Sequence, residues 1–192
     1  MTTETERQVT RTVDGHLAPV AGTWVLDPTH TTLTFEVRHM MIAKVRGAFL
    51  QAEGKIVVPE DPRQTEVEVT VDTASVETGV ADRDNHLRSA DFFDVENYPK
   101  MIYRGKGVEI TDDGYVLKGE LTIRDVTRPV DLPFEFLGGI VDPYGNPRIA
   151  VSASTEIDRT DWNLTWNMAL ETGGVLLGPK VKIFVDTEAT LS

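Results

Sequence analysis

Hydrophobic and polar residues alternate along most of the chain after residue 22. The segment 31–39 shows the alternation best, because Leu33 and Phe35 fall on one side of an extended strand while Thr34 and Glu36 fall on the other. A period of two is the pattern of a β-strand with one buried face. The same pattern recurs in the segments 65–71, 115–123 and 130–136. With the shorter candidates between them, these segments predict about eight or nine strands.

The connections between these segments are short, which favours antiparallel pairing of neighbouring strands. Only 81–97 and 161–174 escape the alternation, and each is long enough for a short helix. So little helix cannot cover a sheet, and the pattern therefore predicts either a β-sandwich or a closed barrel. Gly47, Gly119 and Ala153 at inward positions favour a barrel with an internal cavity, although glycines also relieve strand bending in a filled core.

The chain of 192 residues fits one domain. Residues 1–20 carry no alternating apolar face, and we expect them to form a disordered or loosely attached arm. The barrel domain is expected to span 21–192. The sequence contains neither the apolar run of a signal peptide nor one long enough to span a membrane, so we expect a soluble protein that stays in the cytoplasm.

Acidic residues dominate the charge. The chain has 31 Asp and Glu against 19 Lys and Arg, a formal net charge of -12. Such a charge repels phosphate backbones and anionic lipid surfaces over most of the protein surface, which excludes nucleic acid as an expected partner. The chain also has no cysteine, so disulfides, thiolate nucleophiles and zinc–thiolate sites are excluded.

Two polar motifs place a histidine close to an acid, as Asp27 lies three residues before His30 and Asp84 two residues before His86. A hydrolase or isomerase would use such a histidine as a general acid or base. The structural interpretation is that the first motif satisfies a turn at the barrel rim, while the second starts a helix with Arg83 paired to a carboxylate. Neither motif contains a nucleophile on the sharp strand-to-helix turn that exposes the serine of many hydrolases, and we expect no catalytic residue.

The four histidines show neither HxxxH nor HxH spacing, so we expect no metal and no other cofactor. Met40 and Met41 follow a predicted strand at a position where a turn is usually polar. Flexible methionines suit either an adaptable apolar gate or a plug at one end of the barrel.

A series of short motifs resembles the YceI-like family in order and spacing, from residue 22 to residue 189. The motifs are Trp24-Val-Leu-Asp-Pro-Thr-His30, Phe35-Glu-Val-Arg-His39, Val45-Arg-Gly-Ala-Phe49, Ser75-Val-Glu-Thr-Gly79, Arg83-Asp-Asn-His-Leu87 with Asp91-Phe-Phe-Asp94, Tyr98-Pro99, Gly119-Glu-Leu-Thr-Ile123 and Val126-Thr-Arg-Pro-Val130. The resemblance implies an extended eight-stranded antiparallel barrel, lipocalin-like, with short helices near its openings, and a homodimer. Family members bind polyisoprenoids, isoprenoid quinones or related long amphiphiles in the lumen.

The sequence departs from the family at two points. Many members are exported, whereas this chain shows no export signal. After the motif Ile157-Asp-Arg159 the family usually has an aromatic residue followed by glycine, whereas this chain has Trp162 and Trp166 in the segment 161–166. Two tryptophans at this place could reshape one opening of the barrel.

From the pattern and the resemblance together, we predict a non-catalytic protein that holds a long apolar lipid for carriage, storage or sensing. The residues expected to face the lumen and contact the lipid are Trp24, Leu33, Phe35, Val37, Phe49, Val69, Met101, Tyr103, Leu121, Phe134, Phe136, Val151 and Ile183. The residues expected at the rim, near a polar head group, are His30, Met40, Met41, Arg83, His86, Trp162 and Trp166. Two other classes remain open: a hydrolase or isomerase acting on a lipid-like substrate through His86 or His30, and a filled β-domain that serves as a scaffold for a partner protein.

Overall fold

The structure is a computed structural model that describes residues 8–111, 114–171 and 173–192. The strands are β1 (Thr10–Val13), β2 (His16–Pro19), β3 (Gly22–His39), β4 (Ala43–Phe49), β5 (Ala52–Val58), β6 (Glu66–Asp72), β7 (Val76–Glu77), β8 (Lys100–Thr111), β9 (Gly114–Ile123), β10 (Val126–Pro129), β11 (Leu132–Val141), β12 (Pro147–Asp158) and β13 (Leu177–Leu191). The helical elements are α1 (Ala81–Arg88) and the 3₁₀ turns η1 (Pro62–Gln64), η2 (Thr73–Ser75) and η3 (Arg159–Trp162).

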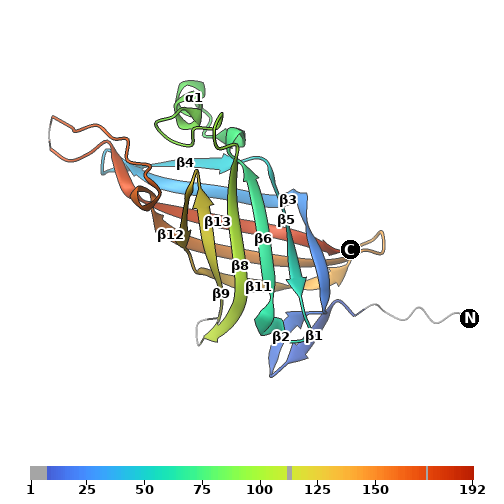
Figure 1. Cartoon of the computed structure of the whole chain (residues 1–192). Coiled ribbons are helices and arrows are strands. Elements are labelled where there is room, and N and C mark those ends of the chain that lie inside the picture. Colours follow the sequence, from blue (N-terminus) through green and yellow to red (C-terminus); the bar gives the residue numbers. More distant parts are fainter. Residues whose placement is uncertain (1–7, 112–113, 172) are drawn as a thin grey trace, which may run out of the picture.

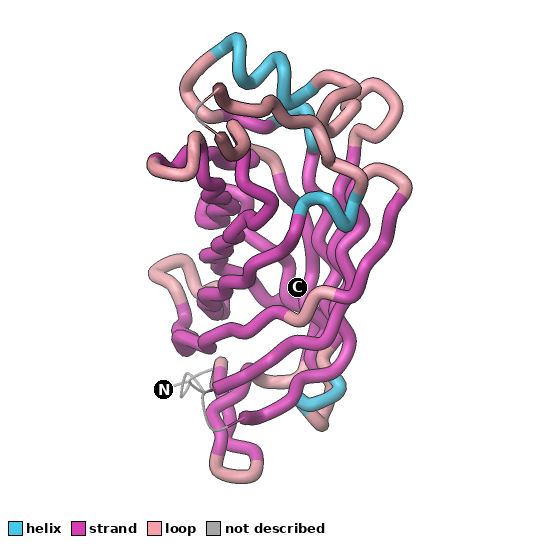
Figure 2. Tube along the Cα trace, turned by 90° about the vertical axis from the view of Figure 1, so that its left-hand side faces the viewer, coloured by secondary structure: helices cyan, strands magenta, loops and turns pink. Residues whose placement is uncertain are grey.

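Eight strands close an antiparallel barrel in the order β3, β5, β6, β8, β9, β11, β12 and β13, and pairing of β13 with β3 completes the ring. Long β3 pairs with β5 through its first part and with β4 through its last part. Figure 1 shows the strands running along an elongated barrel, with α1 at one end and the β1–β2 hairpin at the other. The tube in Figure 2 shows the same separation, with helical segments gathered mainly near one end. The predicted all-β, lipocalin-like barrel is confirmed.

The period of two predicts the facing of the strands correctly. Val67, Val69 and Val71 of β6 all face the interior, whereas Glu66 and Glu68 on the same strand are exposed. Of the two non-alternating segments, 81–97 contains helix α1, while the described residues of 161–174 contain the end of the 3₁₀ turn η3 and no α-helix. Among the described residues, no helix has the length and apolar character needed to cross a membrane.

Two glycines serve a purpose different from the one that the sequence suggested. A side chain at Gly47 would collide with the ring of Phe35, and one at Gly119 would collide with the ring of Tyr103. Both glycines therefore make room for an aromatic ring from the neighbouring strand instead of enlarging the cavity. Of the three small residues taken as signs of a cavity, Ala153 lines it.

The segment expected to be a loose arm contains an ordered hairpin. Strands β1 and β2 pair over Thr10–Val13 and His16–Pro19, and Val9 beside them is only 6% exposed because it packs into the barrel core. The guanidinium of Arg11 donates to Glu60 at 2.8 Å and to the carbonyl of Pro59 at 2.7 Å. Residues 1–7 of the expected arm lie outside the described residues.

Deleting residues 1–19 is therefore expected to lower the free energy of unfolding by about 2 kcal/mol or more, because burial of a valine such as Val9 alone contributes about 1.5–3 kcal/mol. Chemical denaturation of the shortened and complete chains measures the difference. Deletion of residues 1–7 alone is the matched control, since it keeps all the hairpin contacts described above. Equal midpoints for all three proteins would show that the hairpin does not stabilise the barrel.

Candidate functional site

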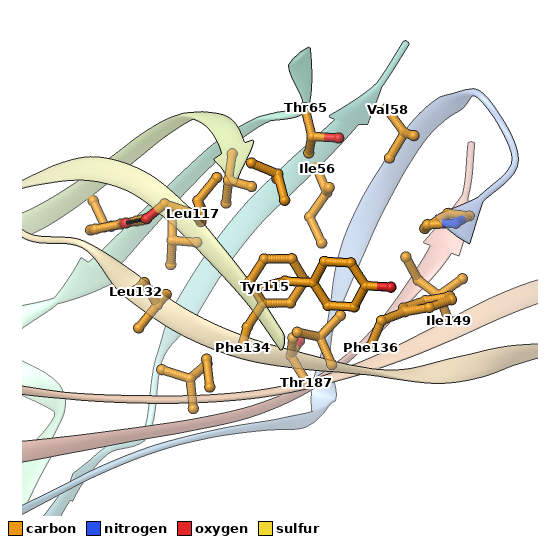
Figure 3. Close-up of a pocket in the computed structure, with 18 of the residues that line it drawn as sticks. Ile56, Val58, Thr65, Tyr115, Leu117, Leu132, Phe134, Phe136, Ile149 and Thr187 are labelled. Atoms are coloured by element: carbon orange, nitrogen blue, oxygen red, sulfur yellow. Dashed lines mark hydrogen bonds between the residues drawn. The ribbon is translucent and has the colours of Figure 1, made fainter. Parts of the chain in front are cut away.

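The barrel encloses a cavity of about 230 Å³ with an almost wholly apolar lining (Figure 3). The rings of Tyr115 and Phe134 stack in it, with centroids 5.4 Å apart. Nine residues predicted from the sequence to face the lumen line this cavity: Leu33, Val69, Met101, Tyr103, Leu121, Phe134, Phe136, Val151 and Ile183. At the hairpin end, the lining includes Val13, Leu17 and Ala18, so the β1–β2 hairpin covers this end of the barrel.

A second apolar cavity of about 100 Å³ lies toward the α1 end. Phe35, Val37 and Phe49, also predicted to face the lumen, line this cavity. Both cavities share Leu33, Met101 and Ile183 in their linings. The two spaces therefore lie next to each other inside the barrel, and we refer to them together as the apolar channel.

Trp24 is the exception among the predicted lumen residues. Its side chain is fully buried, but it lines neither cavity. Trp24 packs with Leu26, Val58 and Ile149 in a separate core cluster, and its Nε1 donates to the carbonyl of Val20 at 3.2 Å. Inward facing alone does not distinguish a side chain that fills a barrel end from one that borders the cavity.

Among the lining residues absent from the sequence prediction, two groups are informative. Tyr115 and Leu117 continue the inward register of Leu121 on β9, so the alternation contained the information needed to assign them. Leu87 and Phe93, which help to close the second cavity, come from the non-alternating segment around α1. Phe93 packs edge-on against Phe49, with ring centroids 5.3 Å apart, a contact for which period two gives no signal.

The hydroxyl of Tyr103, a polar group in the channel lining, is hydrogen-bonded to the backbone. The Tyr103 hydroxyl donates to the carbonyl of Val130 at 3.1 Å, and burial raises the pKa of this phenol above its ordinary value. A phenol held neutral and hydrogen-bonded in this way suits an apolar ligand and offers no nucleophile at neutral pH.

Arg159 lies at the α1 end of the channel and is only 4% exposed. Its guanidinium donates to the carbonyls of Leu164, Trp166, Leu177 and Gly178, and burial lowers its pKa. Within the described part of the chain, no carboxylate lies within 4 Å of this guanidinium. Arg159 therefore fastens the loop before β13 to the end of the barrel through carbonyl contacts.

The seven predicted rim residues do not gather around the channel, and within the described chain none of them lines either cavity. Met40 and Met41 are exposed in the β3–β4 turn. Trp162 is buried and donates its Nε1 to the carbonyl of Leu121 at 3.0 Å. Trp166 packs edge-on against the ring of His86, with centroids 4.5 Å apart. These positions differ from the predicted rim because Trp162 packs in the core, whereas Trp166 and His86 pack against each other and against Phe92.

The His30 motif forms a hydrogen-bonded turn on the outer side of the barrel wall. His30 Nδ1 lies 2.9 Å from Asp27 Oδ2 and 3.0 Å from Thr29 Oγ1. A nucleophile–base–acid relay requires the two ring nitrogens to face different partners, whereas here both contacts use the same nitrogen. The arrangement fits the structural interpretation of this motif and lacks the geometry of a catalytic triad.

The second polar motif fastens α1 to the preceding segment. Arg83 Nε donates to Thr78 Oγ1 at 2.6 Å, and the carboxylate of Asp84 accepts from Thr78 N at 2.8 Å. His86 Nε2 lies 2.8 Å from Asp91 Oδ2. Arg83 thus pairs with a threonine and not with the carboxylate that the sequence suggested. These contacts use the polar groups of the motif to hold α1 in place.

Asp27, His30 and Glu188 bring their ligand atoms within 4.8 Å of one another, close enough in principle for a metal ion. A guanidinium already occupies this place. Arg148 Nη1 lies 2.7 Å from Asp27 Oδ2 and 3.2 Å from Glu188, and Arg148 Nε lies 2.8 Å from Asp142. The Arg148 guanidinium holds the pKa of Asp27 and of Asp142 well below the ordinary value.

Replacing Arg148 by methionine is expected to lower stability at neutral pH and to weaken resistance to acid. In the wild type, the depressed carboxyl pKa values of Asp27 and Asp142 contribute stability that is complete above the ordinary aspartate pKa of 3.8 and is lost as the pH falls through the folded-state values. The difference in free energy of unfolding between wild type and variant should therefore be widest near neutrality and narrow below about pH 4.

Denaturant midpoints measured from pH 7 down to pH 2.5 check this expectation. Lys106→Met is the control, because Lys106 forms an exposed pair with Glu66 at 2.8 Å and such pairs contribute little. A pH-independent difference between wild type and Arg148→Met would contradict the assigned ion pairs.

Comparison with known proteins gives consistent matches over most of the chain. A family model described as the YceI-like domain matches residues 24–189. A UPF0312 protein from Staphylococcus aureus (strain N315) is 33% identical over 174 residues, which cover 88% of this chain and 98% of that protein. A solved YceI protein from Campylobacter jejuni is 28% identical, with a TM-score of 0.68, and the match covers 81% of this chain and 90% of that one.

A more distant structure is described as a polyisoprenoid binding domain from Saccharophagus degradans. It is 16% identical to this chain with a TM-score of 0.65, and the match covers 88% of this chain and 98% of that domain. At this level of identity, the likeness shows a shared fold.

Proposed function

The chain belongs to the YceI-like domain family, and we propose that it binds one long apolar lipid in the barrel lumen without catalysing a reaction. A polyisoprenoid or an isoprenoid quinone is the proposed ligand. The observation that carries the proposal is the apolar channel formed by the two adjoining cavities.

The chemistry of the channel favours a ligand that gains affinity from length. Each buried CH₂ group contributes about 0.8 kcal/mol, so a five-carbon isoprene unit gains roughly 4 kcal/mol at most. A few units therefore outweigh the free energy lost when a flexible chain is immobilised. Because the Tyr103 hydroxyl already donates to a backbone carbonyl, it does not need a hydrogen-bond acceptor on the ligand.

The Saccharophagus degradans domain, which shares the fold and is described as polyisoprenoid binding, supports this choice of ligand class by analogy. The non-catalytic role is supported by the positions of His30 and His86. Their hydrogen bonds hold a turn and a helix in place, and neither side chain lines the channel. The homodimer implied by the family resemblance stays a prediction.

The proposal predicts that affinity rises with chain length until the channel is filled. Competition against a fluorescent apolar probe, with a series of polyprenols and isoprenoid quinones, measures this dependence. Each added isoprene unit should tighten binding by at least about tenfold while channel space remains, since 1.4 kcal/mol corresponds to a factor of ten. Equal affinity for all chain lengths would contradict binding along the lumen.

A further inference from the structure

Five exposed apolar side chains project from one end of the barrel, and we call them the apolar tip. They are Met40, Met41, Ile42, Met168 and Val175. Ile42 is 86% exposed and Met41 is 61% exposed, which is unusual for side chains of this size when they lie together. Neither residue contributes to a cavity lining or to a core cluster.

The tip combines two loops that are fixed to each other. Met40 N donates to the carbonyl of Leu176 at 2.7 Å, and the Met41 side chain lies directly against the backbone of Gly174. Figure 1 shows the β3–β4 turn and the loop before β13 leaving the same end of the barrel. Because the two loops are fastened together, their apolar side chains form one surface.

The strands below the tip carry positive charge although the protein is acidic. Arg38 and Lys44 face each other across β3 and β4, and Arg46 lies opposite Glu36 one step further along. Glu36 contacts both Lys44 at 2.6 Å and Arg46 at 2.9 Å, whereas Arg38 adds a third cation beside this single carboxylate on the two strands. Glu171 in the second loop is an exposed acid that partly offsets this charge.

The tip also adjoins the channel. Val37 and Leu177 line the second cavity, and both lie at the base of the tip, where β3 and β13 meet its two loops. A surface that contacted the tip would therefore lie beside the α1 end of the lumen.

We propose that the apolar tip docks this protein on an anionic lipid bilayer. Ile42 and the methionines enter the interface between head groups and acyl chains, while Arg38, Lys44 and Arg46 contact the negative head groups. Apolar insertion together with positive flanking charge is the combination that peripheral membrane binding uses. The positive hairpin makes this end the local exception to the general repulsion between an acidic protein and an anionic surface. The proposal goes beyond lipid binding in the lumen and does not depend on it.

The opposite end of the barrel supplies a control surface. Ile140 is 65% exposed and Tyr144 is 88% exposed on the β11–β12 hairpin. The charged groups at this end include the Arg148 guanidinium, opposite Ile140, and the three carboxylates of Asp27, Asp142 and Glu188 around it, so acids outnumber the cation. Apolar exposure is therefore comparable at the two ends, but the sign of the neighbouring charge differs.

Vesicle flotation with the full chain tests the proposal. The vesicles contain either phosphatidylglycerol mixed with phosphatidylcholine or phosphatidylcholine alone, with no isoprenoid added. Wild type should float with the anionic vesicles at low salt, and less protein should float as salt is added.

The double variant Met41→Ser/Ile42→Ser should lose most of this binding. Arg38→Gln should weaken it by about fivefold, since one cation near such a surface contributes about 1 kcal/mol. Ile140→Ser/Tyr144→Ser should bind as wild type does.

Absence of wild-type flotation with anionic vesicles would overturn the proposal, as would equal loss of binding in the tip variant and the control variant. Analytical ultracentrifugation of the same proteins distinguishes the competing occupant. If the wild type is a dimer that does not bind vesicles, and Met41→Ser/Ile42→Ser is a monomer, the tip is an interface between two copies of this chain. All substituted residues are exposed, so circular dichroism is expected to report a folded barrel in each variant.

Discussion

Replacing Leu33 by arginine is expected to abolish lipid binding and to lower the free energy of unfolding by about 3 kcal/mol or more. Leu33 lines both cavities, so an arginine there would block the channel at the point where its two parts adjoin. The new guanidinium would be desolvated among apolar side chains. Lipid content after purification and denaturant midpoints measure the two effects.

Thr32→Arg is the matched control, one residue away on the same strand. Thr32 is exposed and lies opposite Asp186 of β13, so its replacement should change stability by no more than about 0.5 kcal/mol and leave the lipid in place. Glu36 is unsuitable as an outward control because its carboxylate is paired with both Lys44 and Arg46. Equal lipid content in Leu33→Arg and Thr32→Arg would show that the lipid does not occupy the lumen.

Trp24→Ala is expected to cost about 3–5 kcal/mol of stability, the usual range for removing a large aromatic side chain from a core. The indole is fully buried beside Ile149 and Ala189 and is hydrogen-bonded through Nε1. Because Trp24 lines neither cavity, the protein that remains folded should keep its lipid stoichiometry. Thermal denaturation and lipid analysis of the same preparation test both statements.

Val25→Ala is the control for this variant, because Val25 is the next residue on β3 and is 43% exposed. It should change stability by less than about 1 kcal/mol. A Trp24→Ala protein that is stable but has lost its lipid would place the indole in the binding site and not in the end of the core.

The lining of the lumen was predictable because strand periodicity is a local property. On β3, an inward Leu33 requires an inward Phe35 and an outward Thr32 wherever the strand stays regular. Of the thirteen residues predicted to face the lumen, twelve line one of the two cavities. Periodicity indicates which side chains point into the barrel, but not how far along the barrel each one lies. The position of Trp24 beyond the end of the cavity follows only from how the barrel closes.

The ends of the barrel were not predictable in the same way. The β1–β2 hairpin buries Val9 and Ala18 against the barrel, and neither residue belongs to an alternating run of its own. The histidines attracted attention because a histidine near an acid is typical of active sites. In the folded chain, His30 is instead hydrogen-bonded to the nearby carboxylate of Asp27, and His86 to that of Asp91. Such local hydrogen bonds look the same in sequence as catalytic pairs.

The central claim is that the lumen holds a long apolar chain. Organic extraction of the purified, folded protein followed by mass spectrometry tests it most directly, with Leu33→Arg prepared in parallel as the blank. We expect the wild type to yield an isoprenoid chain in about one-to-one ratio with the protein, and Leu33→Arg to yield none. A wild-type extract without any long-chain lipid, from protein that also fails to take up added polyprenol, would contradict the account.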